Sequence, residues 1–220
     1  KRIRQLQPHI ILNDRLGIDQ DVKTPEQYQP TEWVKVDDKP VVWEACQTFS
    51  GSWGYHRDEQ TWKSLDQLVK MLIDSVSKGG NLLLNVGPTA RGEFDARALD
   101  RLEGMGRWMR HHAKSIYGCT QAPEEFPRPE DCRYTYNPKT NRLYLHIFSW
   151  PFKHIHLPHM ADKVEYAQLL NDASEIKLTK SDPNAVHGNM STRQPEHVLT
   201  LNLPTVKPEV AVPVVELFLK

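Results

Sequence analysis

Carboxylates, one arginine and large aromatic side chains collect in the first half of the sequence, at the ends of short apolar runs or in the segments that follow them. The set comprises Asp14, Arg15, Glu26, Trp43, Glu44, Trp53 and Tyr55. Carboxyl groups exchange protons with glycosidic oxygens, and flat aromatic faces cover the apolar C–H patches of a pyranose ring. The set therefore indicates a carbohydrate site, although ion pairs that only support strand ends would use the same residue types.

Three apolar runs are expected to form the buried parallel strands that position these residues. They lie at residues 9–12, 41–46 and 81–86. The first ends in the polar triplet 13–15, and the second leads into the polar and aromatic loop 50–55. Runs that are apolar on both faces are typical of parallel sheets. Because barrel enzymes keep their chemistry at the carboxyl ends of such strands, we expect the polar residues to gather there.

Two helices should alternate with these strands. Apolar residues from Leu65 to Val76 repeat at helical spacing, and Ser64 and Gln67 are placed as a capping box. A second periodic segment spans residues 99–116. Strand, loop, helix, strand and helix together make a βα repeat. Residues 17–40 show no sustained period, so we expect a long loop, a feature that is usually functional in compact domains.

The sequence changes character after residue 117. A proline-rich and acidic stretch at 123–131 leads into short alternating segments separated by turn residues. The candidate strands are residues 132–136, 143–147, 153–157, 164–170, 175–179, 197–203 and 213–219. Several short strands of this kind predict an antiparallel β-sandwich of about six to eight strands. The expected fold class is therefore α/β followed by all-β.

Composition narrows the possible partners. Lys plus Arg and Asp plus Glu number 28 each, so there is no net charge to attract nucleic acid or an anionic membrane. No stretch approaches the roughly 20 apolar residues of a membrane span. The ten histidines are scattered and mostly lack metal-ligand spacing, so we expect no metal site. The three cysteines are expected to be reduced, with a bridge between Cys119 and Cys132 left open.

Several segments, taken in order, closely resemble the second half of the catalytic domain of glycoside hydrolase family 29, the α-L-fucosidases. They are residues 6–17, which include Asn13-Asp14-Arg15, then 23–27 (Lys-Thr-Pro-Glu-Gln), 43–46 (Trp-Glu-Ala-Cys), 52–55 (Ser-Trp-Gly-Tyr) and 76–88. Residues 106–108 and 115–118 fit the same pattern. The resemblance covers roughly residues 1–120, and it is the ensemble of segments that is specific.

The resemblance implies a division of the chain and a mechanism. Residues 1–119 would be the C-terminal portion of a (β/α)8 TIM-like barrel, and residues 120–220 a C-terminal β-sandwich domain. The family uses a retaining mechanism with a covalent fucosyl-enzyme, and the position that matches its acid/base is Glu26. The nucleophilic aspartate belongs to earlier barrel strands. We therefore expect an upstream segment or another chain to supply the remainder of the barrel.

The resemblance also assigns the substrate-binding residues. Arg15 matches an arginine that contacts the sugar, and Trp53 matches an aromatic residue that packs against the C5 methyl group of fucose. Trp43, Glu44 and Tyr55 would form walls and supports of the site. Two structural interpretations stay open, because Arg15 could form only an ion pair and Glu26 could be a solvated loop residue. An acid needs a proton at neutral pH, so we expect Glu26 to be buried among apolar groups.

Two functions remain to be separated. The first is a retaining α-L-fucosidase that hydrolyses terminal α-linked L-fucose from a fucosylated glycan or oligosaccharide, with no metal and no cofactor. The alternative is a non-catalytic module that binds fucose or glycan, or serves in assembly. For the enzyme, a secreted, periplasmic or lysosomal-type location is favoured over a cytoplasmic one.

Overall fold

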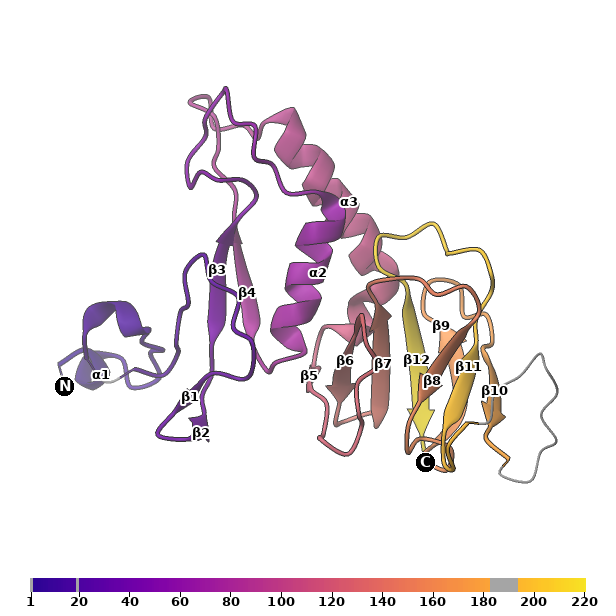
Figure 1. Cartoon of the computed structure of the whole chain (residues 1–220). Helices are drawn as coiled ribbons and strands as arrows, with labels where there is room; N and C mark the ends of the chain where they lie inside the picture. Colours follow the sequence, from indigo (N-terminus) through magenta and orange to yellow (C-terminus); the bar gives the residue numbers. More distant parts are fainter. Residues whose placement is uncertain (1, 19, 183–193) are drawn as a thin grey trace.

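The computed structural model of the chain describes residues 2–18, 20–182 and 194–220. The helical elements are α1 (Arg2–Leu6), η1 (Asp14–Leu16), α2 (Leu65–Val76), α3 (Ala96–His112) and η2 (Ala113–Ser115). The strands are β1 (Lys35–Val36), β2 (Lys39–Pro40), β3 (Glu44–Thr48), β4 (Asn81–Asn85), β5 (Thr120–Gln121), β6 (Cys132–Asn137), β7 (Arg142–Ile147), β8 (His154–Leu157), β9 (Val164–Leu169), β10 (Lys177–Lys180), β11 (Leu199–Asn202) and β12 (Val214–Leu219). Figure 1 shows helices α2 and α3 between the β3–β4 pair and the later strands.

Strands β3 and β4 form a parallel pair whose register runs from Glu44 opposite Asn81 to Thr48 opposite Asn85. The chain before β3 extends this pairing through isolated parallel bridges, which join Lys23 to Trp43, Glu26 to Cys46 and Asn13 to Val22. Part of the segment predicted as a loop between residues 17 and 40 is therefore extended backbone aligned with β3. No local signal predicts this pairing, because the partners of Lys23 and Glu26 lie 20 positions further along the chain.

The first and third predicted strands are less regular and less buried than expected. Residues 9–12 form no strand, and Ile11 is 72% exposed. Leu83 in β4 is 50% exposed. Within the described residues, the carbonyl of Leu12 accepts from the Asp21 and Val22 N–H groups, and this is the segment's link to an extended neighbour. The barrel that would cover these side chains is thus not seen in this chain, and the barrel assignment stays a prediction.

Helix α2 begins as predicted. The Ser64 hydroxyl accepts from the Gln67 backbone N–H at 3.2 Å, and the Gln67 side chain accepts from the Ser64 N–H at 2.8 Å, so the capping box is confirmed. Helix α3 is capped by Asp95, whose carboxylate accepts from the Arg97 N–H at 2.8 Å. Helix α2 packs against β4, and α3 packs against α2. The two capped helices therefore support the β3–β4 pair.

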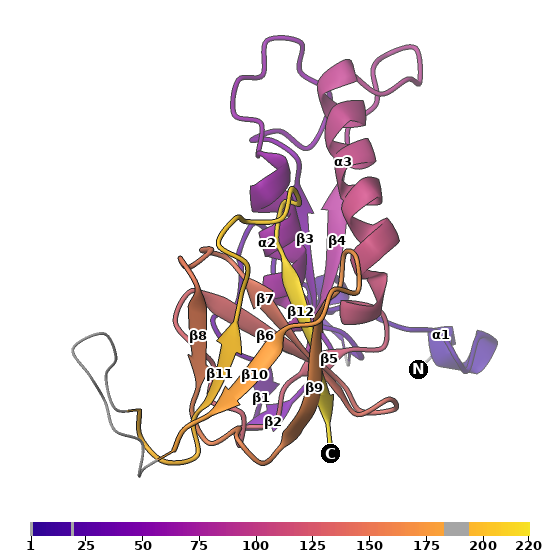
Figure 2. The ribbon, with the colours of Figure 1, turned by 90° about the vertical axis from the view of Figure 1, so that its right-hand side faces the viewer.

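The later strands form two antiparallel sheets, a five-stranded sheet in the order β5-β6-β7-β12-β9 and a three-stranded sheet in the order β10-β11-β8. All seven strands predicted between residues 132 and 219 are confirmed, with ends that differ by one or two residues. Side chains from both sheets meet in one apolar core that includes Leu145, Leu157, Leu199 and Leu217. Figure 2 shows the two sheets face on, with the helices behind them. The arrangement is a β-sandwich.

A second apolar core joins the helices to the five-stranded sheet. Val69 and Ile73 of α2, with Trp108 of α3, pack against Tyr144 and Val214. The Trp108 indole N–H donates to the Val212 carbonyl at 2.9 Å. The division proposed at residues 119/120 falls between η2 and β5, and the two sides of that division share this core. The three cysteines are free, so the Cys119–Cys132 bridge left open by the sequence does not form.

Replacing Gly80 with alanine is expected to destabilise the fold by about 1–3 kcal/mol, the usual cost of overpacking. A Cβ atom at this position would overlap the indole ring of Trp43, which is fully buried and cannot move aside. Equilibrium unfolding in urea measures the change. The matched control is Gly106→Ala in α3, where an added Cβ meets nothing within 4 Å and where alanine should leave stability equal or higher. Equal stability for the Gly80→Ala variant and the unsubstituted chain would contradict the packing described here.

Candidate functional site

Arg15 and Glu26 lie together at the edge of the parallel strands. Asn13 caps the short η1 turn by accepting from the Arg15 backbone N–H at 3.2 Å, and Gly17 ends the turn in the left-handed conformation. The Arg15 guanidinium then donates through Nε to the Thr24 hydroxyl at 2.8 Å and forms an ion pair with Glu26 through Nη1. The segment that carries Glu26 is held to β3 because Cys46 donates to Pro25 and Gln27 donates to Cys46, each at 2.9 Å.

Asp14 supports this cluster from behind. Its carboxylate accepts from the Thr24 backbone N–H at 3.1 Å and from the Thr24 hydroxyl. Burial by itself would raise the pKa of Asp14, but the two hydrogen bonds from Thr24 outweigh it and lower that pKa below its ordinary value. The Thr24 hydroxyl thus donates to an ionised Asp14 while it accepts from Arg15. Thr24 lies in the Lys-Thr-Pro-Glu-Gln segment, and the sequence alone assigned no role to it.

Glu26 is not surrounded by apolar groups. Its side chain is 42% exposed, and its partner within the described residues is the Arg15 guanidinium. The burial expected for a proton-holding acid is therefore missing from this chain. The interpretation of Arg15 as an ion-pair residue is supported with Glu26 as partner, whereas no ion pair of Arg15 with Asp14 or Glu44 is seen in residues 2–18, 20–182 and 194–220.

Trp53 and Tyr55 lie in the loop that follows β3, and both remain about two-fifths exposed, at 39% and 40%. Two residues at the end of β4 position this loop. The Asn85 side chain donates to the Trp53 carbonyl at 2.6 Å. At Gly87, a Cβ atom would lie 2.5 Å from the Gly54 carbonyl carbon and from the Tyr55 nitrogen, so only glycine permits the close approach. The sequence signal for both residues is the Asn-Val-Gly-Pro strand end at residues 85–88.

Trp43 and Glu44 occupy different environments although they are adjacent. Trp43 is fully buried, and its indole N–H donates to the Lys78 carbonyl at 3.1 Å. Its ring therefore has no free surface for a sugar and acts as a support of the strands. Glu44 is partly buried and, with Thr24 and Asn81, lines a hollow of about 620 Å³ that the exposed Ile11 also lines.

The family model described as Alpha-L-fucosidase matches residues 1–114, which is more than half of the chain. The chain belongs to the α-L-fucosidase family. Plasma α-L-fucosidase of Pongo abelii is 33% identical over 153 residues, which are 64% of this chain and 32% of that protein. An α-L-fucosidase of Branchiostoma floridae is 35% identical over 115 residues, which are 50% of this chain and 25% of that protein. This fucosidase chain therefore spans about one third of the curated relatives it matches.

Solved fucosidase structures share the fold over the whole chain. α-L-Fucosidase isoenzyme 1 from Paenibacillus thiaminolyticus superposes with a TM-score of 0.86 at 37% identity, covering 100% of this chain and 52% of that one. The α-fucosidase of Thermotoga maritima, in complex with a mechanism-based inhibitor, superposes with a TM-score of 0.75 at 26% identity, covering 99% and 47%. The family resemblance drawn from the motifs in the first 120 residues is confirmed.

The structure brings only part of the predicted site together. Arg15 and Glu26 touch, and Glu44 lies beside Thr24 at the same hollow. In the described part of the chain, no hydrogen bond or ion pair connects Trp53 or Tyr55 to that cluster.

Two further features concern the described residues as a whole. None of the described helices is long and apolar enough to cross a membrane. The described residues also contain no group of three or more His, Cys, Asp or Glu side chains placed to hold a metal ion.

Proposed function

We propose that this fucosidase chain supplies the acid/base half of a retaining α-L-fucosidase, and that residues 1–119 are the C-terminal portion of its (β/α)8 barrel. The observation that carries the proposal is the Arg15–Thr24–Glu26 cluster, held beside β3 in a chain whose family is established. In this assignment Glu26 protonates the glycosidic oxygen as the bond to fucose breaks. It then removes a proton from the water that releases the sugar.

The nucleophile of this proposal is an aspartate outside the described cluster. It attacks the anomeric carbon and forms the covalent fucosyl-enzyme, and retaining enzymes place such a pair of carboxyl groups about 5 Å apart. That a related fucosidase was solved with a mechanism-based inhibitor supports this chemistry. We place the remainder of the barrel at the open side of the parallel strands, where Ile11 lines the 620 Å³ hollow and Ile11 and Leu83 are both exposed.

The remaining site residues keep the roles implied by the family. Arg15 orients Glu26 and contacts a sugar hydroxyl through its free N–H groups, since its guanidinium offers donors in a fixed fork. Trp53 packs against the fucose methyl group, and Tyr55 and Glu44 line the site around it. Trp43 supports the strand beneath them. The expected substrate is a fucosylated glycan or oligosaccharide, and the expected reaction uses neither metal nor cofactor.

The anomeric form of the first product tests this function. Chain assembled with the rest of its barrel should release fucose from 4-nitrophenyl α-L-fucoside, and proton NMR in the first minutes should show the α-anomer, as retention requires. The 220-residue chain by itself should release none. A β-anomeric first product would exclude the retaining mechanism. Inactivity of every assembled preparation that is folded would instead favour the non-catalytic glycan-binding module.

A further inference from the structure

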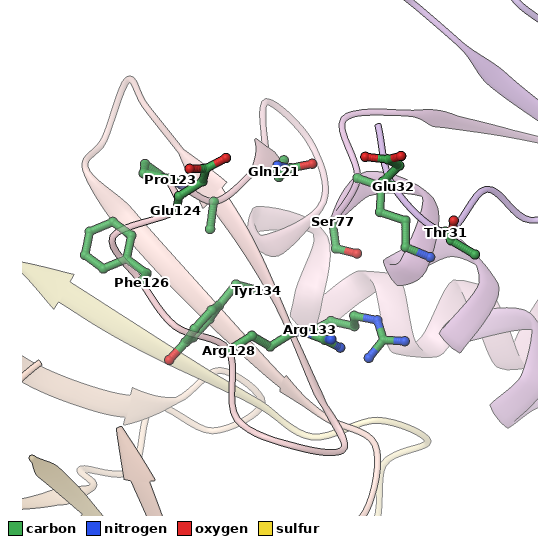
Figure 3. A pocket seen from close by; sticks show the side chains of 12 residues that line it. Thr31, Glu32, Ser77, Gln121, Pro123, Glu124, Phe126, Arg128, Arg133 and Tyr134 are labelled. Atoms are coloured by element: carbon green, nitrogen blue, oxygen red, sulfur yellow. The ribbon is translucent and has the colours of Figure 1, made fainter. Parts of the chain in front are cut away.

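A second polar cavity lies where the helices meet the sandwich. It measures about 440 Å³, within the range of small-molecule sites in proteins. In Figure 3, Thr31, Glu32 and Ser77 approach it from one side, and Gln121, Pro123 and Glu124 from the other. Arg128, Arg133 and Lys78 complete the polar lining, and Phe126 adds an apolar wall. We call it the junction cavity. It shares no lining residue with the Glu26 cluster or with the Trp53 loop.

The walls of the junction cavity are held in fixed positions. Arg133 of β6 donates to Asp74 of α2 at 2.7 Å, and Lys78 pairs with the same carboxylate, so the two sides are tied together. Lys78 also donates to the Pro30 carbonyl at 2.7 Å. Trp33 lies against Gly79, where a side chain would clash with its ring, and this anchors the wall formed by residues 31–32. A site whose walls are already ordered loses little conformational entropy on binding.

The charges around the cavity are nearly balanced. Its lining carries the cations Lys78, Arg128 and Arg133 and the carboxylates Glu32 and Glu124. Behind this lining, Asp74 pairs with two of the cations and Lys35 pairs with Glu32, which adds one charge of each sign. A phosphate or nucleic-acid site would need an excess of positive charge, and a cation site an excess of negative charge. The balance of donors and acceptors fits an uncharged ligand that can do both, and hydroxyl groups do both.

Some polar groups in the lining are free to bind. Among the described residues, the side chains of Gln121 and Glu124 make no hydrogen bond or ion pair within the chain. Arg128 uses one N–H group, which donates to the Cys132 carbonyl at 3.1 Å, and so has further donors left. An amide, a carboxylate and a guanidinium offer acceptors and donors at spacings that suit neighbouring hydroxyl groups. Phe126 and Pro123 provide the apolar surface that the C–H face of a sugar ring needs.

We propose that the junction cavity is a non-catalytic binding site for a neutral sugar residue of a glycan. The cavity shares no lining residue with the hollow beside Thr24 and Glu44, and it lies at the other end of β4 from the Trp53 loop. Ser77 and Lys78 precede the start of β4, whereas Asn85 and Gly87, which position the Trp53 loop, lie at its end, about 13 Å away for a strand of this length. The proposal does not depend on hydrolysis by this protein.

Titration with 2′-fucosyllactose and with lactose, followed by saturation-transfer NMR and calorimetry, tests the site. The protein carries Arg15→Ala and Glu26→Gln, so that binding at the proposed catalytic cluster is removed. Binding of at least one sugar is expected to persist. The double variant Gln121→Ala/Glu124→Ala should weaken it at least tenfold, whereas Lys139→Ala, in the exposed turn between β6 and β7, should leave it unchanged.

Three results would overturn the proposal. They are an absence of sugar binding in the Arg15/Glu26 background, binding that survives the Gln121/Glu124 substitution, and displacement of the sugar by inorganic phosphate at equal concentration. Thermal melting confirms that each variant is folded. If the double variant does not fold, Glu124→Gln alone replaces it, and it should still weaken sugar binding because it removes one charged acceptor. Absence of hydrolysis by the assembled protein that keeps Arg15 and Glu26, with intact sugar binding at the junction cavity, would count against the proposed function only.

Discussion

Replacing Glu26 with alanine is expected to lower kcat/KM for a fucosylated oligosaccharide by about 10²- to 10⁴-fold, the usual contribution of a positioned general acid. A sugar alkoxide leaves poorly without a proton, so the acid matters most for such substrates. The loss should be smaller for 4-nitrophenyl α-L-fucoside, because 4-nitrophenolate leaves readily. Added azide should restore turnover of the aryl substrate, since it attacks the fucosyl-enzyme without needing a base. Steady-state kinetics with both substrates measure the difference.

The control for this experiment is Glu165→Ala, which removes an exposed glutamate of β9 in the sandwich. It should leave both substrates unaffected. An equal loss on both substrates for Glu26→Ala, with no response to azide, would mean that Glu26 only orients Arg15. A loss below threefold on the oligosaccharide would remove Glu26 from the mechanism altogether and support the interpretation of a solvated loop glutamate.

Acidification is expected to destabilise the contact between α3 and the sandwich through two buried histidines. His112 donates through Nδ1 to the Trp108 carbonyl at 2.8 Å, and His146 donates through Nε2 to the Thr135 hydroxyl at 2.9 Å. The other ring nitrogen of each is buried and has no hydrogen-bond partner in the described residues. Burial lowers the pKa of His146 to about 3, and it also lowers the pKa of His112. Both rings are therefore neutral in the folded chain.

The direction of the pH effect follows from proton binding. Below the ordinary histidine pKa of 6.5, the unfolded chain takes up protons that the folded chain does not, so unfolding becomes more favourable as the pH falls. The stabilisation is complete above pH 6.5 and decreases toward pH 3. Each histidine can contribute a slope of up to about 1.4 kcal/mol per pH unit. Urea unfolding between pH 7 and pH 4 measures this slope.

A substitution separates His146 from the carboxylates that also titrate in acid. His146→Gln keeps a donor for Thr135 and removes the titrating ring, so it should reduce the slope between pH 6.5 and 4. His154→Gln, on an exposed position of β8, should leave the slope unchanged. The experiment compares the slope of the unfolding free energy against pH, and not the absolute stability of each variant. An unchanged slope in His146→Gln would show that this histidine does not sense acid in the folded chain.

The elements that could be predicted from sequence are those with a strong local signal. Sandwich strands such as β8 and β11 alternate buried and more exposed side chains, and helix α2 begins at the capping box of Ser64 and Gln67. Residues 22–27 carry no such signal, because a proline and polar residues interrupt the period and their partners are Asn13, Trp43 and Cys46 elsewhere in the chain. Residues 9–12 were predicted as a strand from their apolar composition alone, and composition does not provide a pairing partner.

The candidate site was predictable in residue type and not in geometry. The motif around Glu26 identified the glutamate. Its ion pair with Arg15, and the hydrogen bond from Arg15 to Thr24, depend on how the η1 turn places Arg15 beside residues 9 and 11 positions further along the chain. Trp43 counted as a site aromatic from its residue type and its place in the Trp-Glu-Ala-Cys segment, yet its side chain is fully buried in the core. The junction cavity combines residues from 31 to 134, and no local pattern connects positions that far apart.

Helices α2 and α3 couple the unfolding of the parallel strands to that of the sandwich. One side of α2 lies against β4, and both α2 and α3 belong to the apolar core shared with Tyr144 and Val214. Separation of the sandwich from the helices would expose the side chains of Trp108 and Val69 to water. It would also expose the helix-facing surface of the five-stranded sheet. The two halves therefore melt as a single cooperative unit, and a cut in the proline-rich segment between them would not liberate two independently stable pieces.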